Sequence, residues 1–568
     1  MKYLLVGINA KYIHSSLALH SLSAYVRKYS DINPVVCEYT INMSISEIVQ
    51  GIYAEAPGFI GFSTYIWNVD IVKQVVRDIH TLLPDTIIYL GGPEVSFECD
   101  KFLEANPEVD GIMIGEGEQT FLELIQYYES VTNGDTAAKS LDDIQGICYI
   151  NRSTNQITTT TSRPAIDLST VPFPYENLSD FENKIIYYET SRGCPFGCSY
   201  CLSSVDKSLR FRDMDLVERE FQVFLDAQIP QVKLVDRTFN IDHKRSIQML
   251  TFLRDHDNGI TNFHFEIAGD ILTDDEIEII NSLRPGLIQL EIGVQSTNCD
   301  TLEAIHRHTD LDKLRTNTAK LLNGGKVHLH LDLIAGLPYE DLASFKESFN
   351  NVYSMGSHDL QLGFLKVLKG APINSMVEDQ DIKHSGYAPY EVLSTKYLSY
   401  ADICELKRVE EMLEIYHNSC QFVRAEKYLL QHESTPYDFY LNLANYYKEI
   451  GQLVVQCKRA VRYEILIDYA INKLGWAESK IATLRSLLTL DFYSREKAKA
   501  RPSFAPDLSM HKANIRNIMD ELSVASPSGL FHVEPLPDSN SYEIFDYSKR
   551  SPITGNIITE LHQFPVQY

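Results

Sequence analysis

The stretch of sequence that decides the fold reads TSRGCPFGCSYCLSS and spans residues 190–204. It places Cys194, Cys198 and Cys201 within eight positions, with three and then two residues between them. A 4Fe–4S cluster normally takes four cysteine ligands, so three thiolates leave one iron open for chemistry. The loop follows a predicted strand, and Gly193 permits a tight turn before the first cysteine. The spacing therefore predicts an iron–sulfur loop.

The alternative to a cluster is a zinc site. Zinc usually takes four ligands from paired cysteine or histidine spacings. No second cysteine pair follows the loop, and no histidine-rich segment lies nearby. The other seven cysteines are scattered singly, and we expect each to be a small buried apolar residue. They are Cys37, Cys99, Cys148, Cys299, Cys404, Cys420 and Cys457.

The composition excludes some classes of partner. The chain has 568 residues, with 51 Lys+Arg against 77 Asp+Glu and a formal charge of −26. That average charge repels polyphosphates, so a nucleic-acid partner is not expected, and we interpret the more basic stretch 448–501 as a solvated helix face. No run approaches the ~18–20 apolar residues of a membrane helix. The start of the chain has no signal-peptide cleavage site, so we expect a cytoplasmic protein with reduced thiols.

The first part of the chain alternates short apolar runs with amphipathic segments. Runs that are apolar on both faces suit a parallel sheet covered by helices on each side. Between the first two runs, residues 16–29 have Leu19, Leu22 and Val26 on one helical face. The pattern predicts a doubly wound, Rossmann-like α/β domain. The predicted strands are 3–7, 35–39, 59–63, 86–90 and 111–114.

From about residue 126 to residue 182 the sequence changes in character. CYINRSTNQITTTTSRP at 148–164 predicts a polar hairpin. LSTVPFPYENL at 168–178 contains two prolines and predicts a non-helical interdomain linker.

A second α/β pattern begins after the linker. Alternating strands and helices there fit a partial (β/α)6, TIM-like barrel better than a second open sheet. The predicted strands are 185–189, 231–235, 263–267, 287–293, 327–333 and 360–365. The predicted helices between them include 216–227, 245–254 and 311–322.

The strand signal fades after residue 370. The remaining sequence predicts a mainly α-helical C-terminal domain with a short mixed tail after Pro502. The predicted helices are 391–416, 424–431, 437–450 and 465–488.

The cysteine loop and its context resemble the radical SAM superfamily. Its signature is CxxxCxxC with an aromatic residue before the last cysteine, after the first strand of a partial barrel, and Tyr200 occupies that aromatic position. The resemblance covers residues 183–370. It implies that Cys194, Cys198 and Cys201 hold a 4Fe–4S cluster whose open iron binds S-adenosylmethionine (SAM). It also implies reductive cleavage of SAM to methionine and a 5′-deoxyadenosyl radical, with electrons from a donor such as flavodoxin or ferredoxin.

Polar residues near the cluster loop and at the carboxyl ends of the barrel strands are candidates to bind SAM. The active site of such barrels lies at that end, and carboxylates accept hydrogen bonds from ribose hydroxyls and ammonium groups. Many family members have Gly-Gly-Glu after the second strand, whereas this sequence has VDR at 235–237, so Asp236 is the expected substitute. For each carboxylate the alternative is a local cap or salt bridge. The candidates are Tyr200, Asp236, Glu266, Glu291 and Gln295.

The N-terminal domain has glycine loops where a doubly wound sheet binds ligands. GGPEVSF at 91–97 and GEGEQTF at 115–121 allow close approach to the backbone. These turns resemble the cobalamin-binding domain of cobalamin-dependent radical SAM enzymes, which implies that a corrinoid docks over them. The implied cobalamin-binding residues are Gly91, Gly92, Gly115, Glu116, Gly117 and Thr120.

The sequence departs from the widespread cobalamin motif Asp-x-His-x-x-Gly. Aligned on His14, it has Tyr12 and Leu17 in place of the aspartate and the glycine. Many radical SAM relatives also lack the motif and leave the lower cobalt face without a protein ligand. Whether His14 ligates cobalt therefore stays open.

The resulting interpretation has four parts along the chain. Residues 1–140 form the cobalamin-binding Rossmann-like domain and 141–182 the hairpin and linker. Residues 183–370 form the radical SAM barrel and 371–568 the helical domain, which resembles extensions of unknown function. The resemblance implies cobalamin-dependent methyl transfer to an unactivated centre of a small-molecule substrate. The alternatives are cobalamin-independent rearrangement or dehydrogenation, and a non-catalytic three-cysteine metal sensor or scaffold.

Overall fold

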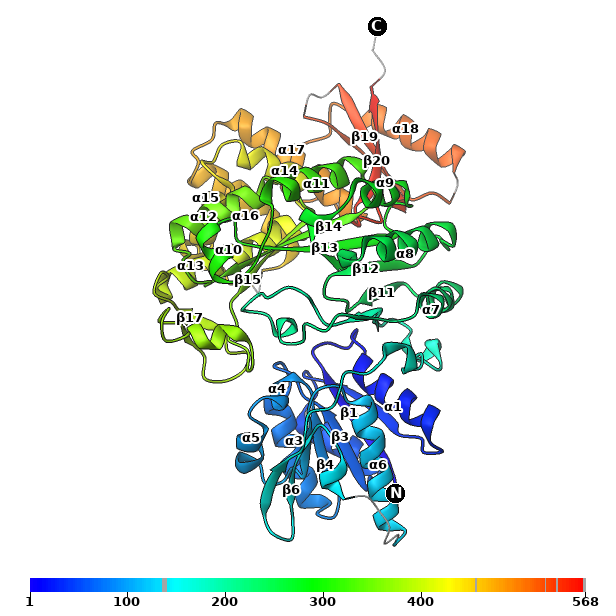
Figure 1. The fold of residues 1–568 in the computed structure, drawn as a ribbon. Coiled ribbons are helices and arrows are strands. Elements are labelled where there is room, and N and C mark those ends of the chain that lie inside the picture. The colour runs from blue at the N-terminus through cyan, green and yellow to red at the C-terminus, as the bar shows by residue number, and fades with distance from the viewer. Residues whose placement is uncertain (135–139, 455–456, 527, 538–539, 565–568) are drawn as a thin grey trace. The chain divides into compact units, whose positions relative to one another are not determined.

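The computed structural model describes residues 1–134, 140–454, 457–526, 528–537 and 540–564 (Figure 1). The chain divides into two compact units, and we describe each by itself. The first unit contains residues 1–289, 303–308 and 365–395. The second contains residues 290–302, 309–364 and 396–568.

The first unit begins with a seven-stranded sheet of order β2-β1-β3-β4-β5-β6-β7. The five parallel strands are β1 Tyr3–Asn9, β2 Val35–Thr40, β3 Phe59–Ser63, β4 Ile87–Gly91 and β5 Gly111–Met113. They confirm the five predicted strands. The polar hairpin is also confirmed, as β6 Ile147–Asn151 and β7 Gln156–Thr159. It pairs with β5 in antiparallel fashion and so continues the sheet.

Helices cover both faces of this sheet (Figure 1). Leu4, Val6 and Ile8 of β1 belong to a core with α2 and α3, while the alternate residues Tyr3 and Leu5 belong to a core with α1 and α6. This alternation follows from the two-residue period of a strand. The helices are α1 Leu17–Tyr29, α2 Ile45–Ala54, α3 Val69–Leu82, α4 Pro93–Ser96, α5 Cys99–Ala105 and α6 Glu118–Thr132. β2 lies on one side of β1 and β3 lies on the other. In doubly wound sheets, ligands bind at the carboxyl ends of the strands where the strand order reverses in this way.

The first unit also contains the first three strands of the second α/β pattern. They are parallel and are ordered β12-β11-β8, with β8 Ile186–Tyr188, β11 Gln231–Leu234 and β12 Asn262–Ile267. A short antiparallel pair, β9 Ser191–Arg192 and β10 Arg210–Phe211, flanks the cysteine loop. The helices are α7 Met214–Asp226, α8 His243–Asp255 and α9 Asp274–Ser282. A further small pair is β16 Lys383–His384 with β17 Val392–Ser394.

The second unit contains the remaining strands of that pattern. β13 Ile288–Gln295 enters it from the first unit, and β14 His328–Ala335 pairs in parallel with β15 Asp359–Phe364. Helices α10 Cys299–Ala304, α11 Leu311–Gly324 and α12 Leu342–Tyr353 alternate with these strands. All six strands predicted for this region are therefore present.

The C-terminal part of the second unit is mainly helical, as predicted. Its helices are α13 Tyr400–Leu413, α14 Val423–Leu430, α15 Pro436–Glu449, α16 Arg459–Asn472, α17 Glu478–Arg495 and α18 Lys512–Ala525. A π-helical turn, Glu414–Asn418, follows α13. The tail forms a three-stranded antiparallel sheet, β18 Phe531–Pro535, β19 Ser541–Arg550 and β20 Ile557–Gln563. None of the helices described here is both long and apolar enough to cross a membrane.

Two predicted helices are wrong in their extent. The helix over 391–416 begins only at Tyr400, because Ser399 and Asp402 form a capping box there. The single helix over 465–488 is two helices, α16 and α17, because the chain turns between them at Gly475, whose φ is +61°.

The prediction for the seven scattered cysteines is also partly wrong. Cys299 is exposed, and Cys37 and Cys404 are half-buried. Cys299 is the first residue of α10, whose inward side chains are Thr301 and Leu302. Helix orientation therefore decides the exposure of this thiol.

Candidate functional site

The cysteine loop belongs to the first unit. Cys194 and Cys198 are 8% and 6% exposed, Cys201 is half-buried, and all three are free thiols. Burial raises the pKa of Cys194, and the neighbouring thiols of Cys201 and Cys198 add to that effect. Gly193 has a φ of +88°, and a Cβ added there would lie 2.5 Å from the carbonyl oxygen of Ser208. The turn before the first cysteine thus requires glycine, as predicted from the sequence.

The donor set of this loop fits the corner of an iron–sulfur cluster. Thiolates are the ligands that such clusters take, and a trio of them leaves one iron for another ligand. Within the part of the chain that the structure describes, no three His, Cys, Asp or Glu side chains are arranged to hold a single metal ion. A structural zinc ion requires four ligands directed at one point.

Asp236 contacts the backbone just before the cysteine loop. Its carboxylate is 2% exposed and accepts hydrogen bonds from the backbone N–H groups of Thr190 and Ser191, at 2.7 and 3.2 Å, and from the Thr190 hydroxyl. Burial raises its pKa to about 6. These contacts fix the chain between β8 and β9. A contact of Asp236 with SAM stays a prediction.

An ion-pair network joins the GEGE loop to the cysteine loop. Arg192, two residues before Cys194, contacts Glu116 at 3.0 Å, Glu118 at 2.8 Å and Glu189 at 2.8 Å. Arg210 contacts the same Glu116 oxygen at 2.9 Å. Sequence reasoning missed both arginines, and the position of Arg192 beside the cysteine motif was the available signal. Glu116, predicted to bind cobalamin, is engaged by these two guanidinium groups.

The predicted glycines have different surroundings. Gly92 has a φ of +109°, and a Cβ there would lie 2.5 Å from the Thr64 carbonyl oxygen, while the Thr64 N–H donates to the Gly91 carbonyl at 2.7 Å. Gly115 has a φ of +77°, and a Cβ added there would meet no described atom within 4 Å. A Cβ added at Gly117 would lie 3.0 Å from a methyl carbon of Leu22. Gly115 is therefore the glycine of this group that leaves space beside the backbone.

Thr120 is fully buried near the start of α6. Its hydroxyl accepts a hydrogen bond from Arg163 Nε at 2.9 Å and donates toward the Gln145 carbonyl at 3.3 Å. Both partners lie in the segment 141–182, so these contacts anchor the helix to that segment. A contact with cobalamin is not among them and stays a prediction.

His14 has an orienting partner that the sequence did not indicate. Its Nδ1 lies 2.7 Å from the hydroxyl of Tyr187 on β8. Burial, with the positive charges of Lys11 and Lys233, lowers the pKa of His14. The lowered pKa favours the neutral form of the ring, and Tyr187 holds its Nδ1 in place.

The other SAM candidates fall in different units. Glu266 is half-buried on β12 in the first unit, and Glu291 is half-buried on β13 in the second. Gln295 ends β13 with a φ of +72° and is 8% exposed. Its amide oxygen is buried without a hydrogen-bond partner among the described atoms. A contact of Gln295 with SAM stays a prediction.

Tyr200, the aromatic residue of the cysteine motif, contacts the same arginine as Cys198, one of the predicted cluster ligands. Arg307 Nη1 lies 3.3 Å from the Tyr200 hydroxyl and 3.7 Å from Cys198 Sγ. No local pattern indicated Arg307, because the segment HRHT at 306–309 follows α10 and Arg307 lies 109 residues after Cys198.

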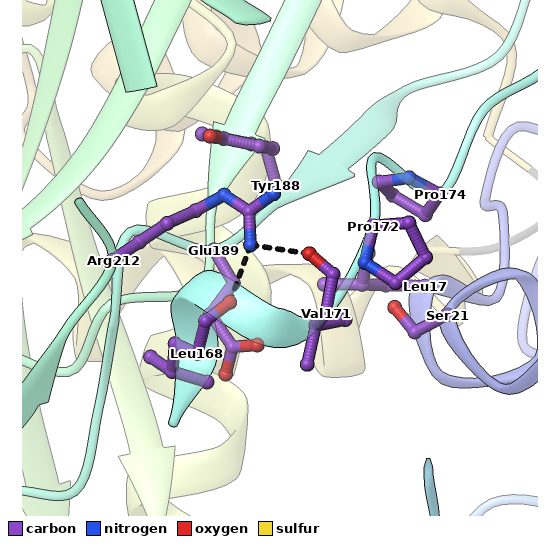
Figure 2. Close-up of a pocket in the computed structure, with 9 residues that line it drawn as sticks. All are labelled: Leu17, Ser21, Leu168, Val171, Pro172, Pro174, Tyr188, Glu189 and Arg212. Carbon is purple, nitrogen blue, oxygen red and sulfur yellow. Dashed lines mark hydrogen bonds between the residues drawn. The ribbon is translucent and has the colours of Figure 1, made fainter. Parts of the chain in front are cut away.

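A small cavity lies beside the linker (Figure 2). Arg212 Nη1 donates to the carbonyl oxygens of Leu168 and Val171, at 2.6 and 2.8 Å, and these residues line the cavity together with Glu189. Its volume is about 20 Å³, which holds one water molecule and no substrate.

Comparison with known families agrees with this geometry. Residues 188–352, which begin six residues before Cys194, match the radical SAM superfamily. The chain therefore contains a radical SAM domain over these residues. The radical SAM segment is preceded by a match to the B12 binding domain over residues 3–125. It is followed by a match to a protein family of unknown function, DUF4080, over residues 378–542.

Two curated relatives of this radical SAM protein are methyltransferases. The cobalamin-dependent radical SAM methyltransferase TokK of Streptomyces tokunonensis is 25% identical over 350 residues, which are 58% of this chain and 50% of TokK. The 2-(S-pantetheinyl)-carbapenam-3-carboxylate methyltransferase of Streptantibioticus cattleyicolor is 24% identical over 491 residues, 78% of this chain and 70% of that protein. The radical SAM protein thus matches about half of the length of TokK.

A solved structure shares the fold. The cobalamin-dependent SAM radical enzyme OxsB with aqua-cobalamin bound superimposes with a TM-score of 0.60 at 15% identity, over 93% of this chain and 84% of OxsB. The likeness extends from the B12 binding domain into the C-terminal region. At this identity it shows the fold of the radical SAM protein.

Proposed function

We propose that this chain is a cobalamin-dependent radical SAM methyltransferase that acts on an unactivated centre of a small molecule. One observation carries the proposal: the three-cysteine loop and the GEGE loop of a B12 binding domain are joined by the Arg192 ion pairs within one unit. The methyltransferase relatives support the choice of reaction. Substrate and product stay unassigned.

In this proposal Cys194, Cys198 and Cys201 hold a 4Fe–4S cluster, and the open iron takes SAM. When bound, the cluster supplies the electron that cleaves SAM to methionine and a 5′-deoxyadenosyl radical. The chain fixes the geometry of the loop through Gly193 and shields it from water. Gln295, whose buried amide oxygen has no hydrogen-bond partner among the described atoms, stays a predicted SAM-binding residue. Asp236 supports the loop backbone.

Cobalamin is proposed to dock at the carboxyl edge of the first sheet, over the loops at 91–97 and 115–121. Gly115 leaves space beside its backbone there. The acidic side chains of Glu116 and Glu118 are engaged by Arg192, so we assign them to holding the two loops together. We also propose an electron donor of the flavodoxin or ferredoxin type and a cytoplasmic location, where the thiols stay reduced.

Anaerobic reconstitution with iron, sulfide and hydroxocobalamin tests the proposal. We expect about four irons per chain, a reducible cluster, stoichiometric corrinoid absorbance and 5′-deoxyadenosine formed from SAM under reduction. Cys194→Ala should abolish the cluster and the deoxyadenosine, whereas Cys299→Ala, at an exposed thiol, should change neither. Zinc or no metal in the wild-type loop would refute the radical SAM assignment.

Methyl transfer needs its own assay. Reconstituted enzyme is incubated with SAM carrying a trideuterated methyl group and extracts of small molecules, and products that gain the label are sought by mass spectrometry. We expect labelled product from the wild type and none from Cys194→Ala. Deoxyadenosine formation with turnover of a substrate that gains no label would instead establish rearrangement or dehydrogenation. Retention of the cluster without SAM cleavage would leave only a sensor or scaffold.

A further inference from the structure

A short segment far from the motif in sequence packs against the cysteine loop. Residues 303–308 belong to the first unit, although the residues on either side of them belong to the second. The backbone N–H of Ser199, between two of the cysteines, donates to the Ile305 carbonyl at 2.9 Å. The Ser199 carbonyl in turn accepts from the Ile373 N–H at 2.7 Å. The middle of the loop is thus held from two sides.

The segment presents a cation to the loop through an uncommon turn. His306 has a φ of +53°, in the left-handed region that residues other than glycine rarely adopt. The next residue, Arg307, has its Nη1 3.7 Å from Cys198 Sγ and 3.3 Å from the Tyr200 hydroxyl. Cys198 is 6% exposed, so this contact is largely shielded from water. Strain of this kind persists where the surroundings fix it, often at functional sites.

The chemistry of this contact is that of a fixed positive charge on a cluster ligand. A guanidinium stays protonated at any pH at which a protein is folded. Reduction adds one negative charge to a cluster, and the potential depends on net charge and on hydrogen bonds to the sulfurs. A nearby cation and an N–H donor both favour the reduced form, and low local dielectric strengthens both effects.

We propose that Arg307 is a positioning residue that raises the reduction potential of the cluster through Cys198. The inference rests on the proposed function, because it requires that Cys198 ligate a cluster. It assigns a specific task to a residue outside the cysteine motif. The Tyr200 hydroxyl accepts from the same Nη1 and keeps the guanidinium over the sulfur.

The test compares midpoint potentials of the reconstituted full-length protein in the absence of SAM. Iron and sulfide are counted first, and the reduced cluster is then followed by electron paramagnetic resonance during a redox titration. We expect R307M to bind the same amount of iron, with a reduced-to-oxidised ratio at least tenfold lower at any fixed potential. That ratio corresponds to a midpoint at least ~59 mV more negative for a one-electron couple. R307K, which keeps the charge, should lie closer to the wild type than R307M does.

The matched control is R254M, which removes an exposed arginine of α8 in the same unit. Its midpoint should equal that of the wild type. If R307M retains the wild-type potential, or if R254M shifts as far as R307M, the inference is overturned while the proposed cluster stands. If R307M fails to hold iron, R307Q is measured instead, and a wild-type potential in R307Q would also overturn the inference. A wild-type protein without a cluster would overturn the inference and the proposed function together.

Discussion

Replacement of Arg192 by methionine tests the ion-pair network that joins the two loops. The Arg192 side chain is 20% exposed and pairs with Glu118, which is 6% exposed, and also with Glu116 and Glu189. Removing one partner of a buried ion pair costs ~3–5 kcal/mol, because the other charges stay desolvated, and an exposed pair contributes ~0–1 kcal/mol. The partial exposure of Arg192 places the expected loss at ~2–4 kcal/mol.

Urea unfolding of the metal-free protein, followed by circular dichroism, measures this loss. For a slope of ~2 kcal/mol per molar urea, a loss of ~2–4 kcal/mol lowers the midpoint of the transition that includes the first sheet by roughly 1–2 M. The control is R254M, whose partner Asp255 is 52% exposed and whose midpoint should move little. Glu118→Gln should reproduce part of the loss, since it removes one acceptor charge and keeps an amide. Equal midpoints for R192M and R254M would refute the reasoning.

Three further predictions concern the loop, its support and the second unit. Gly193→Ala should lower the iron content after reconstitution severalfold, because the added Cβ meets the Ser208 carbonyl at 2.5 Å, and iron equal to wild type would contradict this. Asp236→Ala should also lower iron content, since it leaves the N–H groups of Thr190 and Ser191 without their acceptor, while Asp236→Asn should retain more iron than Asp236→Ala. Burial and the charge of His328 lower the pKa of His358 to about 4, so its stabilising contribution is fully present above the unfolded pKa of ~6.5 and is lost as the pH falls toward 4. The urea midpoint of the second unit should fall over that window, and His358→Gln should flatten the fall.

Local sequence pattern was sufficient for most of the fold. Strands buried on both faces, such as β3 at Phe59–Ser63, are apolar throughout and were located correctly. Errors occurred where a single residue ends or starts a helix. Gly475 divides an otherwise continuous apolar period, and the capping box at Ser399 starts α13 later than the pattern suggested. Periodicity alone does not distinguish one long helix from two.

The residues of the candidate site also fall into those that local sequence could predict and those that it could not. The cysteines and Gly193 are close in sequence, so their spacing determines their chemistry and they could be predicted. Arg307 and Tyr187 are brought to Cys198 and His14 only by the tertiary fold, so no local pattern indicates them. That Glu116 binds cobalamin stays a prediction, whereas its partner Arg192, 76 residues away in the chain, was not foreseen. Long-range ion pairs of this kind cannot be read from one sequence.

The division of the chain has a consequence for any attempt to dissect it. The polypeptide passes from one unit to the other after residues 289, 302, 308, 364 and 395. No uninterrupted stretch of the chain therefore contains the cysteine-bearing unit by itself. A truncation after residue 370 would omit Ile373, whose N–H bonds to Ser199, and Tyr390, whose hydroxyl bonds to Glu94. Deleting the DUF4080 segment, residues 378–542, would keep Ile373 but remove Tyr390 and the other residues of the first unit up to 395. Loss of activity in such a deletion would therefore say nothing about a separate role for that domain.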